Sequence, residues 1–180
     1  MPRLFTGIAL PSEVAEHLAR ARGALEGARW IESSDYHITL RFLGDVDETV
    51  AEALHEGLVA ARIRPPLYLV LDGLGVFGND KPRSLLATVA ANPDLSDLQA
   101  EHERISRDAG AEPDTRRFTP HVTLARFNRQ VRAPQVAHYL AEAGFFPPRP
   151  FTATHVTLFS ARASTGGGPY LVEAVYPLGS

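Results

Sequence analysis

The sequence contains two near-copies of a short motif, His-x-Thr-Leu, built from residue types that can do acid–base chemistry. The first copy places a histidine at His37 and a threonine at Thr39, and the second places them at His121 and Thr123. Both copies lie in runs of β-branched and leucine residues, which favour strands. Because side chains on a strand alternate between its faces, each histidine shares a face with its threonine. The pattern predicts two strands that each present an imidazole beside a hydroxyl.

Two imidazoles and two hydroxyls that face one another suit phosphoester chemistry without a metal. Imidazole titrates near neutral pH, so one ring can take a proton from a nucleophile while the other gives one to the leaving oxygen. The hydroxyls can donate hydrogen bonds to the non-bridging phosphate oxygens. Arg126, close behind the second motif, adds a cation for phosphate or a planar surface for a base. A zinc site is the weaker alternative, because two imidazoles and two hydroxyls are a poor ligand set for zinc.

A third histidine, His155, stands in a similar run, Thr154–Leu158. Strand periodicity alone does not exclude it from the site. Its counterpart by the internal repeat is the strand expected over 67–74, which contains no histidine. The symmetry of the pair therefore selects His37 and His121, and a structural or surface role is expected for His155.

The residues that follow each motif leave alternatives open. Arg126 lies five residues beyond His121, an odd offset that places it on the opposite face of a regular strand. It can reach the site only if the strand bends or ends first. Arg41, four residues beyond His37, has the right parity and is a rival. Phe42 can be either a stacking platform for a base or a core residue.

The composition is that of a globular chain of 180 residues with 44% hydrophobic residues and a net charge of −3. This charge argues against a long electrostatic track along a nucleic-acid backbone. The absence of cysteine excludes a disulfide framework, a thiolate metal site and a cysteine nucleophile. No apolar run is long enough for a membrane span, and the first residues do not read as a signal peptide. The expected location is the cytoplasm.

The order of the expected elements repeats itself as strand, helix, histidine strand, helix and strand. Such a mixture predicts an α+β fold in which two pseudo-equivalent lobes present their histidine strands to a common cleft. The whole chain, 1–180, is expected to form a single domain. Helices are expected over 12–27, 47–62, 93–110 and 134–143, and strands over 3–10, 35–43, 67–74, 84–91, 118–126, 151–160 and 170–175.

Several other residues are expected to take no part in the chemistry. Trp30 and Tyr170 are expected to pack or to line the cleft wall. The run Gly166–Gly168 lacks the lysine and the helix of a phosphate loop, and a hairpin turn is expected there. The remaining histidines fall in helical segments: His17, His55, His102 and His138.

In these motifs and their surroundings the chain resembles the LigT-like two-histidine phosphoesterase superfamily, most closely its RNA 2′,3′-cyclic phosphodiesterase branch, whose members are also called RNA 2′,5′-ligase-like proteins. The resemblance covers nearly the whole chain. It rests on the segments Arg3–Pro11, Arg29-Trp30, His37–Gly44, Phe118–Arg126, Leu158–Ser160 and Gly168–Tyr170.

The resemblance implies a bilobal fold of two antiparallel sheets with outer helices, and hydrolysis of a terminal 2′,3′-cyclic phosphate to a 2′-phosphate without metal or cofactor. A monomer is expected by default for so complete a repeat. By position, His37 and His121 would be the acid–base pair and Thr39 and Thr123 would hold phosphate oxygens. Arg126 and Phe42 would line the nucleotide site. The expected substrates are RNA 3′ ends or small nucleotides with a 2′,3′-cyclic phosphate. The alternatives are a related phosphodiesterase or ligase that acts on 2′,5′-linked or cyclic ADP-ribose-type nucleotides, and a non-catalytic protein that binds RNA ends.

Overall fold

The computed structural model describes residues 2–161 and 169–179, so the predicted turn at Gly166–Gly168 lies outside the described residues. The chain has the expected α+β fold. The strands are β1 (Arg3–Ala9), β2 (Ala28–Trp30), β3 (His37–Asp45), β4 (Leu67–Phe77), β5 (Ser84–Val89), β6 (His121–Phe127), β7 (Arg149–Ala153), β8 (His155–Ala161) and β9 (Leu171–Pro177). The helices are α1 (Ser12–Ala19), α2 (Glu48–Ala60), α3 (Pro93–Asp108), α4 (Ala133–Ala143) and the short 3₁₀ helix η1 (Ser33–Asp35).

One antiparallel sheet runs through both halves of the molecule. Its strand order is β7-β4-β5-β6-β3-β1-β8-β9, and β2 pairs with β6 beside this path. The two sheets expected from the sequence are therefore the two halves of a single sheet. They are joined where β6 meets β3. Outward from that junction, β5, β4 and β7 on one side correspond to β1, β8 and β9 on the other.

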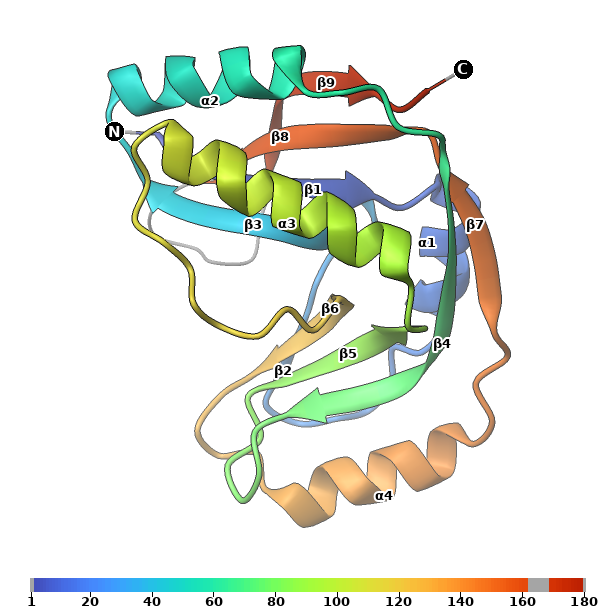
Figure 1. Cartoon of the computed structure of the whole chain (residues 1–180). Helices are drawn as coiled ribbons and strands as arrows, with labels where there is room; N and C mark the ends of the chain where they lie inside the picture. Colours follow the sequence, from blue (N-terminus) through green and yellow to red (C-terminus); the bar gives the residue numbers. More distant parts are fainter. Residues whose placement is uncertain (1, 162–168, 180) are drawn as a thin grey trace.

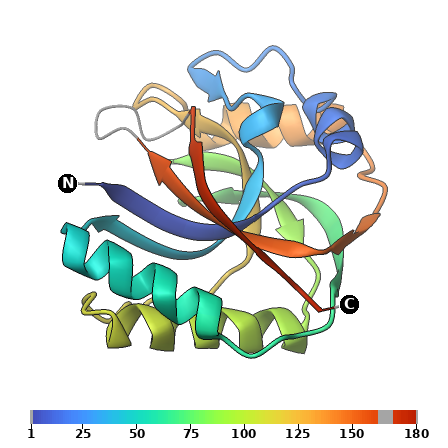
Figure 2. The same cartoon turned by 90° about the horizontal axis from the view of Figure 1, so that it is seen from above.

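The helices follow the same internal repeat. The series β1-α1-β3-α2-β4 is matched by β5-α3-β6-α4-β8, in which the edge strand β7 comes between α4 and β8. Figure 2 shows α2 and α3 side by side on one part of the molecule, and in Figure 1 α3 crosses in front of β3. The end of α1 and one side of α4 line a common pocket on another part. Each half of the sheet is thus accompanied by one helix from each copy of the repeat, which ties the two halves together.

Helix starts and stops follow ordinary capping chemistry. The Asp47 carboxylate caps α2 by accepting a hydrogen bond from the amide of Val50 at 2.9 Å. The Asn92 side chain caps α3, with Pro93 at the first helical position. In contrast, the helix expected over 12–27 ends at Ala19. Beyond it the amides of Ala21 and Arg22 donate to carbonyls three residues back, which closes the last turn before the loop to β2.

The strand expected over 151–160 is two strands with a break at Thr154. The first, β7, pairs with β4, and the second, β8, pairs with β1 and β9 on the other half of the sheet. The chain therefore crosses from one half to the other at Thr154, and a single strand cannot serve both halves. No helix in the described part of the chain is long and apolar enough to cross a membrane.

His102 on α3 is a buried polar group that anchors this helix to the sheet. Its side chain is 4% exposed, and its Nδ1 is hydrogen-bonded to the Thr6 hydroxyl of β1 at 2.8 Å. Burial lowers the pKa of the imidazole from 6.5 to about 4, helped by Arg64 and opposed by Glu101. The ring is therefore neutral in the folded protein at neutral pH.

We expect His102 to make the folded protein sensitive to acid. Between pH 6.5 and about 4 the unfolded chain binds a proton that the folded chain does not. The free energy of unfolding should therefore decrease as the pH is lowered through this range, by at most about 1.4 kcal/mol per pH unit for this residue. His102→Asn should remove that share when urea titrations of the intact protein and the variant are compared from pH 7 to pH 4. An unaltered slope in His102→Asn would contradict the assignment.

Candidate active site

The junction between the two halves of the sheet is a single antiparallel residue pair, Ile38 with Val122. Both side chains are fully buried. In this register the positions on either side place Thr123 opposite His37 and His121 opposite Thr39. Side chains opposite each other across an antiparallel pair lie on the same face. The two predicted histidine–threonine pairs therefore meet at one place.

Each histidine strand carries a bulge at the leucine after its threonine. In β3, Thr6 pairs with Arg41 and Gly7 with Thr39, so Leu40 is the extra residue. A bulge changes the alternation of side chains for all residues that follow it. In β6 the register shifts in the same way around Leu124. The two motifs share this irregularity as well as their sequence.

The bulges decide which of the flanking residues reach the cleft. Phe42 and Arg126, both five residues beyond a histidine, line the cleft together with the motifs. Phe42 remains 40% exposed, so it is not a core residue. Arg126 reaches the cleft because the strand bends, as its odd offset requires.

Arg41 does not reach the cleft. The suggestion from strand parity that Arg41 could be the site arginine in place of Arg126 was therefore wrong. The bulge turns its side chain to the opposite face, where it is 4% exposed. There it forms an ion pair with Glu103 of α3 and donates hydrogen bonds to the backbone carbonyls of Phe42 and Glu112. Arg41 thus fixes the helix and the loop before β6 to the back of β3.

Both imidazoles are oriented by the same backbone contact. Nδ1 of His37 donates to the carbonyl of Asp35 at 2.8 Å, and Nδ1 of His121 donates to the carbonyl of Thr119 at 2.7 Å. A carbonyl only accepts, so Nδ1 carries the proton in each neutral ring and Nε2 is left to accept. Nε2 of His37 lies 2.9 Å from the hydroxyl of Thr39, which donates to it.

The surroundings of both rings favour their neutral form. Burial lowers the pKa of His37 from 6.5 to about 4, an effect that the Asp35 carbonyl opposes and that His121 and Arg126 reinforce. Burial and Arg126 also lower the pKa of His121, against the hydrogen bond to Thr119. Any anion placed between the rings would offset these effects and raise both pKa values.

Aromatic side chains fix the two rings from the side. The His37 ring contacts Phe159 at 5.5 Å between centroids and meets Tyr170 edge-on at 5.2 Å. The His121 ring meets Phe77 edge-on at 4.6 Å. Phe77 and Phe159 occupy equivalent positions in the repeat. Each lies on the second strand outward from a histidine strand, and each is aligned with the residue five positions after the histidine. Ring packing of this kind limits rotation of the imidazoles.

The cleft has a volume of about 580 Å³, within the range of ligand sites. It brings together all six residues predicted for the site. The described residues that line it are Arg3, Phe5, Ile31, Asp35, His37, Thr39, Phe42, Phe77, Arg83, Ser84, Arg116, His121, Thr123, Arg126, Ala161 and Tyr170. In the part of the chain that the structure describes, no group of three His, Cys, Asp or Glu side chains could hold a metal ion.

The other histidines and Trp30 do not line the cleft. His155 lies at the start of β8, opposite Pro177 of β9. The four remaining histidines lie on the four helices, one on each. Trp30 packs against Tyr139 at 5.9 Å between ring centroids, within the core. Tyr170 is a cleft-wall residue, as expected, and its amide donates to the carboxylate of Asp35 at 3.2 Å.

Sequence reasoning missed the three further arginines of the cleft wall. Arg3, Arg83 and Arg116 lie outside the repeated motifs and have no spacing relative to the histidines that would indicate a shared face. Arg116 is held by Asp114, whose carboxylate accepts two hydrogen bonds from its guanidinium at 3.0 and 3.1 Å. Phe5 belongs to the opening segment that carries the family resemblance, but nothing in that segment assigned it a role.

Gly7 of β1 is where the backbone beside the first motif leaves no room for a side chain. A Cβ at this position would lie 2.7 Å from the carbonyl oxygen of Ile38 and 3.4 Å from Cδ2 of His37. We expect Gly7→Ala to force β1 and β3 apart, to destabilise the protein by about 1–3 kcal/mol and to shift the NMR signals of the His37 ring.

The matched control is Gly73→Ala, in which the added Cβ meets only the Thr88 hydroxyl at 3.3 Å. Urea denaturation and histidine NMR spectra of both variants test this expectation. Equal stability and unchanged His37 signals in Gly7→Ala would show that the close approach does not position the ring.

Comparison with known proteins finds relatives of this chain by sequence and by structure. Residues 10–165 match the model of the 2′-5′ RNA ligase superfamily. An Aeropyrum pernix protein named RNA 2′,3′-cyclic phosphodiesterase is 35% identical over 133 residues, which cover 71% of this chain and 75% of that protein. A Bacillus subtilis protein of the same name is 31% identical over 169 residues, covering 91% and 86%. The crystal structure of E. coli LigT complexed with 3′-AMP superposes with a TM-score of 0.79 at 25% identity and covers all of both chains.

Proposed function

The chain belongs to the 2′-5′ RNA ligase superfamily, and from this premise we propose that it is a metal-independent RNA 2′,3′-cyclic phosphodiesterase. The observation that carries the proposal is the convergence of two imidazoles, each with an unprotonated Nε2, in one cleft. The names of the A. pernix and B. subtilis relatives support the substrate class. Family membership agrees with the resemblance noted in the motifs.

In the proposed reaction the cyclic phosphate lies between the two histidines. One imidazole takes a proton from water, whose oxygen attacks phosphorus, and the other gives a proton to O3′ as the P–O3′ bond breaks. The product carries a 2′-phosphate and a free 3′-hydroxyl. Thr39 and Thr123 donate hydrogen bonds to the non-bridging oxygens, where negative charge gathers in the transition state.

Arg126 and Phe42 complete the proposed site from equivalent positions in the repeat. The Arg126 guanidinium supplies a permanent positive charge near the phosphate. The exposed ring of Phe42 offers a surface on which the terminal base can stack. The substrate is then an RNA end or a nucleotide, because only a ribose has the 2′-oxygen that a 2′,3′-cyclic phosphate requires.

We also propose that the chain works as one domain and as a monomer in the cytoplasm. The sheet continues through both halves, and a single chain supplies both histidine–threonine pairs. The lack of cysteine fits a reducing compartment.

The direct test is hydrolysis of a short RNA that ends in a 2′,3′-cyclic phosphate, in excess chelator. We expect the intact protein to release a 2′-phosphate end. His37→Ala and His121→Ala should each lose roughly 10²-fold or more in rate, because each removes one partner in proton transfer. His155→Ala is the matched control and should keep the full rate.

Three results would contradict the proposal. Loss of activity in chelator would mean that a metal takes part. Full activity in either His37→Ala or His121→Ala would remove that residue from the acid–base pair. An intact protein that binds the RNA end without hydrolysing it would be a binding protein instead.

The lowered imidazole pKa values predict an acidic pH optimum for kcat/KM, which reports the free enzyme. The reaction needs one neutral and one protonated ring, yet both pKa values lie below 6.5. The reactive singly protonated form should therefore become scarcer as pH rises. We expect kcat/KM to fall from pH 6 to pH 8, with an apparent pKa for this limb below 6.5. If the decrease in kcat/KM instead has an apparent pKa above 7, the rings are not desolvated in the free enzyme.

A further inference from the structure

Asp35 acts on His37 in two ways, once directly and once through Tyr170. Its backbone carbonyl accepts the hydrogen bond from Nδ1 of His37 at 2.8 Å. Its carboxylate accepts a hydrogen bond from the amide of Tyr170 at 3.2 Å. The Tyr170 ring in turn meets the His37 ring edge-on, with 5.2 Å between the centroids. One residue therefore sets both the tautomer of this imidazole and the aromatic wall beside it.

The backbone of Asp35 is itself fixed. Asp35 is the last residue of η1, and its amide donates to the carbonyl of Glu32 at 2.9 Å. The next amide, that of Tyr36, donates to the carbonyl of Ser33 at 3.2 Å, and the Tyr36 side chain is buried. A carboxylate on this backbone can anchor a segment that comes from elsewhere in the chain.

Tyr170 depends on such an anchor more than the other aromatic residues beside the histidines. Phe77 and Phe159 lie within strands that are paired with their neighbours. Tyr170 stands one residue before β9, whose pairing with β8 begins at Leu171. Its amide donates to the Asp35 carboxylate instead of entering that ladder. The position of the Tyr170 ring is therefore set by a single side chain.

The two copies of the motif differ at this point. Thr119 takes the place of Asp35 in the second copy, and its carbonyl orients His121 in the same way. The wall beside His121 is Phe77, which the sheet holds. Of the cleft-lining residues that the structure describes, Asp35 alone carries a carboxylate. The anchored wall is thus an addition to the His37 side of the repeat.

We propose that Asp35 is a positioning residue for His37, whose carboxylate holds Tyr170 against the imidazole so that the ring keeps its orientation and stays shielded from water. The catalytic part of this inference rests on the proposed function, in which His37 is one of the two proton-transfer groups. Asp35 acts through Tyr170 rather than on the substrate. A ring that is already held needs no reorganisation when the substrate arrives.

The pKa of His37 reports on this shield. The titratable and charged groups that face the ring are Asp35, His121, Arg126 and Tyr170. Desolvation is the main cause of the low pKa, and His121 and Arg126 lower it further. Release of Tyr170 would admit water and raise the pKa toward 6.5, whereas loss of the Asp35 charge alone would lower it. The two effects have opposite signs, so a titration separates them.

The experiment follows the pKa values of His37 and His121 by ¹⁵N NMR and the pH profile of kcat/KM on an RNA with a 2′,3′-cyclic phosphate end. In Asp35→Ala we expect the pKa of His37 to rise and that of His121 to stay unchanged. The maximum of the kcat/KM profile should fall by about tenfold, and its decrease at high pH should move to higher pH.

Two further variants separate the hydrogen bond from the charge. Asp35→Asn keeps an oxygen that accepts from the Tyr170 amide, so it should retain the low pKa of His37 and the rate of the intact protein. Tyr170→Ala should raise the pKa of His37 as Asp35→Ala does. The double variant should raise it no further than Tyr170→Ala, because both changes remove the same wall.

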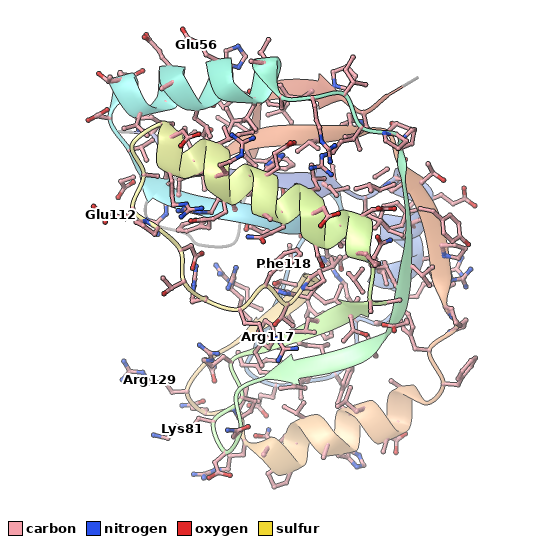
Figure 3. All side chains as sticks on the ribbon, viewed as in Figure 1. Glu56, Lys81, Glu112, Arg117, Phe118 and Arg129 are labelled. Carbon is pink, nitrogen blue, oxygen red and sulfur yellow. The ribbon has the colours of Figure 1, made fainter. Side chains whose placement is uncertain are left out.

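Glu32→Ala and Glu56→Ala are the matched controls. Glu32 directly precedes the same short helix and its side chain is 76% exposed. Glu56 is an exposed residue of α2 that lies on the outer side of this helix in Figure 3. Neither lines the cleft, and both variants should keep the titration and the rate of the intact protein. Circular dichroism shows whether each variant is folded.

The outcomes separate this inference from the proposed function. An unchanged pKa of His37 in Asp35→Ala, or an equal decrease in Asp35→Ala and Asp35→Asn, would overturn the positioning role and leave the phosphodiesterase proposal intact. Additive effects in the double variant would overturn it as well. If the intact protein hydrolyses no cyclic phosphate, the proposed function fails, and the NMR titration, which needs no substrate, still decides whether Asp35 positions the ring.

Discussion

The structure depends on one short contact, the antiparallel pairing of β3 with β6 at Ile38 and Val122. Two buried hydrocarbon side chains on one face hold the strands, and four polar side chains gather on the other. Had the strands met one residue out of register, Ile38 would lie opposite Thr123, and one of the two motifs would turn its histidine and threonine toward the core. The core therefore selects the register, and the register assembles the site. Helix α3 crosses in front of β3 (Figure 1) and is tied to it by the ion pair between Glu103 and Arg41.

Both imidazoles are prepared for proton transfer by groups that belong to the backbone. Each ring donates from Nδ1 to the carbonyl two residues before it, so the tautomer is set without a carboxylate partner. Desolvation keeps the rings neutral until an anion arrives. In the proposed reaction a phosphate between them would supply the missing counter-charge, raise both pKa values and let the pair take up its working proton. Substrate binding and protonation are then coupled.

Much of this could be predicted from the sequence, because the His-x-Thr-Leu pattern has the period of a strand and occurs twice. The pairing of His37 with His121 and the α+β fold followed from that repeat. The bulges could not be predicted, since they arise from the registers with β1 and β5 rather than from β3 and β6 alone. For that reason strand parity wrongly favoured Arg41, which is buried against Glu103. The cleft role of Arg83 likewise depends on which strands lie side by side.

The most direct test of this account is ¹⁵N NMR of the two histidine rings, with and without a bound nucleoside 2′-phosphate. We expect the free protein to show neutral rings protonated at Nδ1 that titrate below pH 6.5, and the nucleotide to raise the pKa of both His37 and His121. Rings protonated at Nε2, or pKa values that do not respond to the nucleotide, would contradict the claim that the two motifs form one phosphate-binding acid–base site.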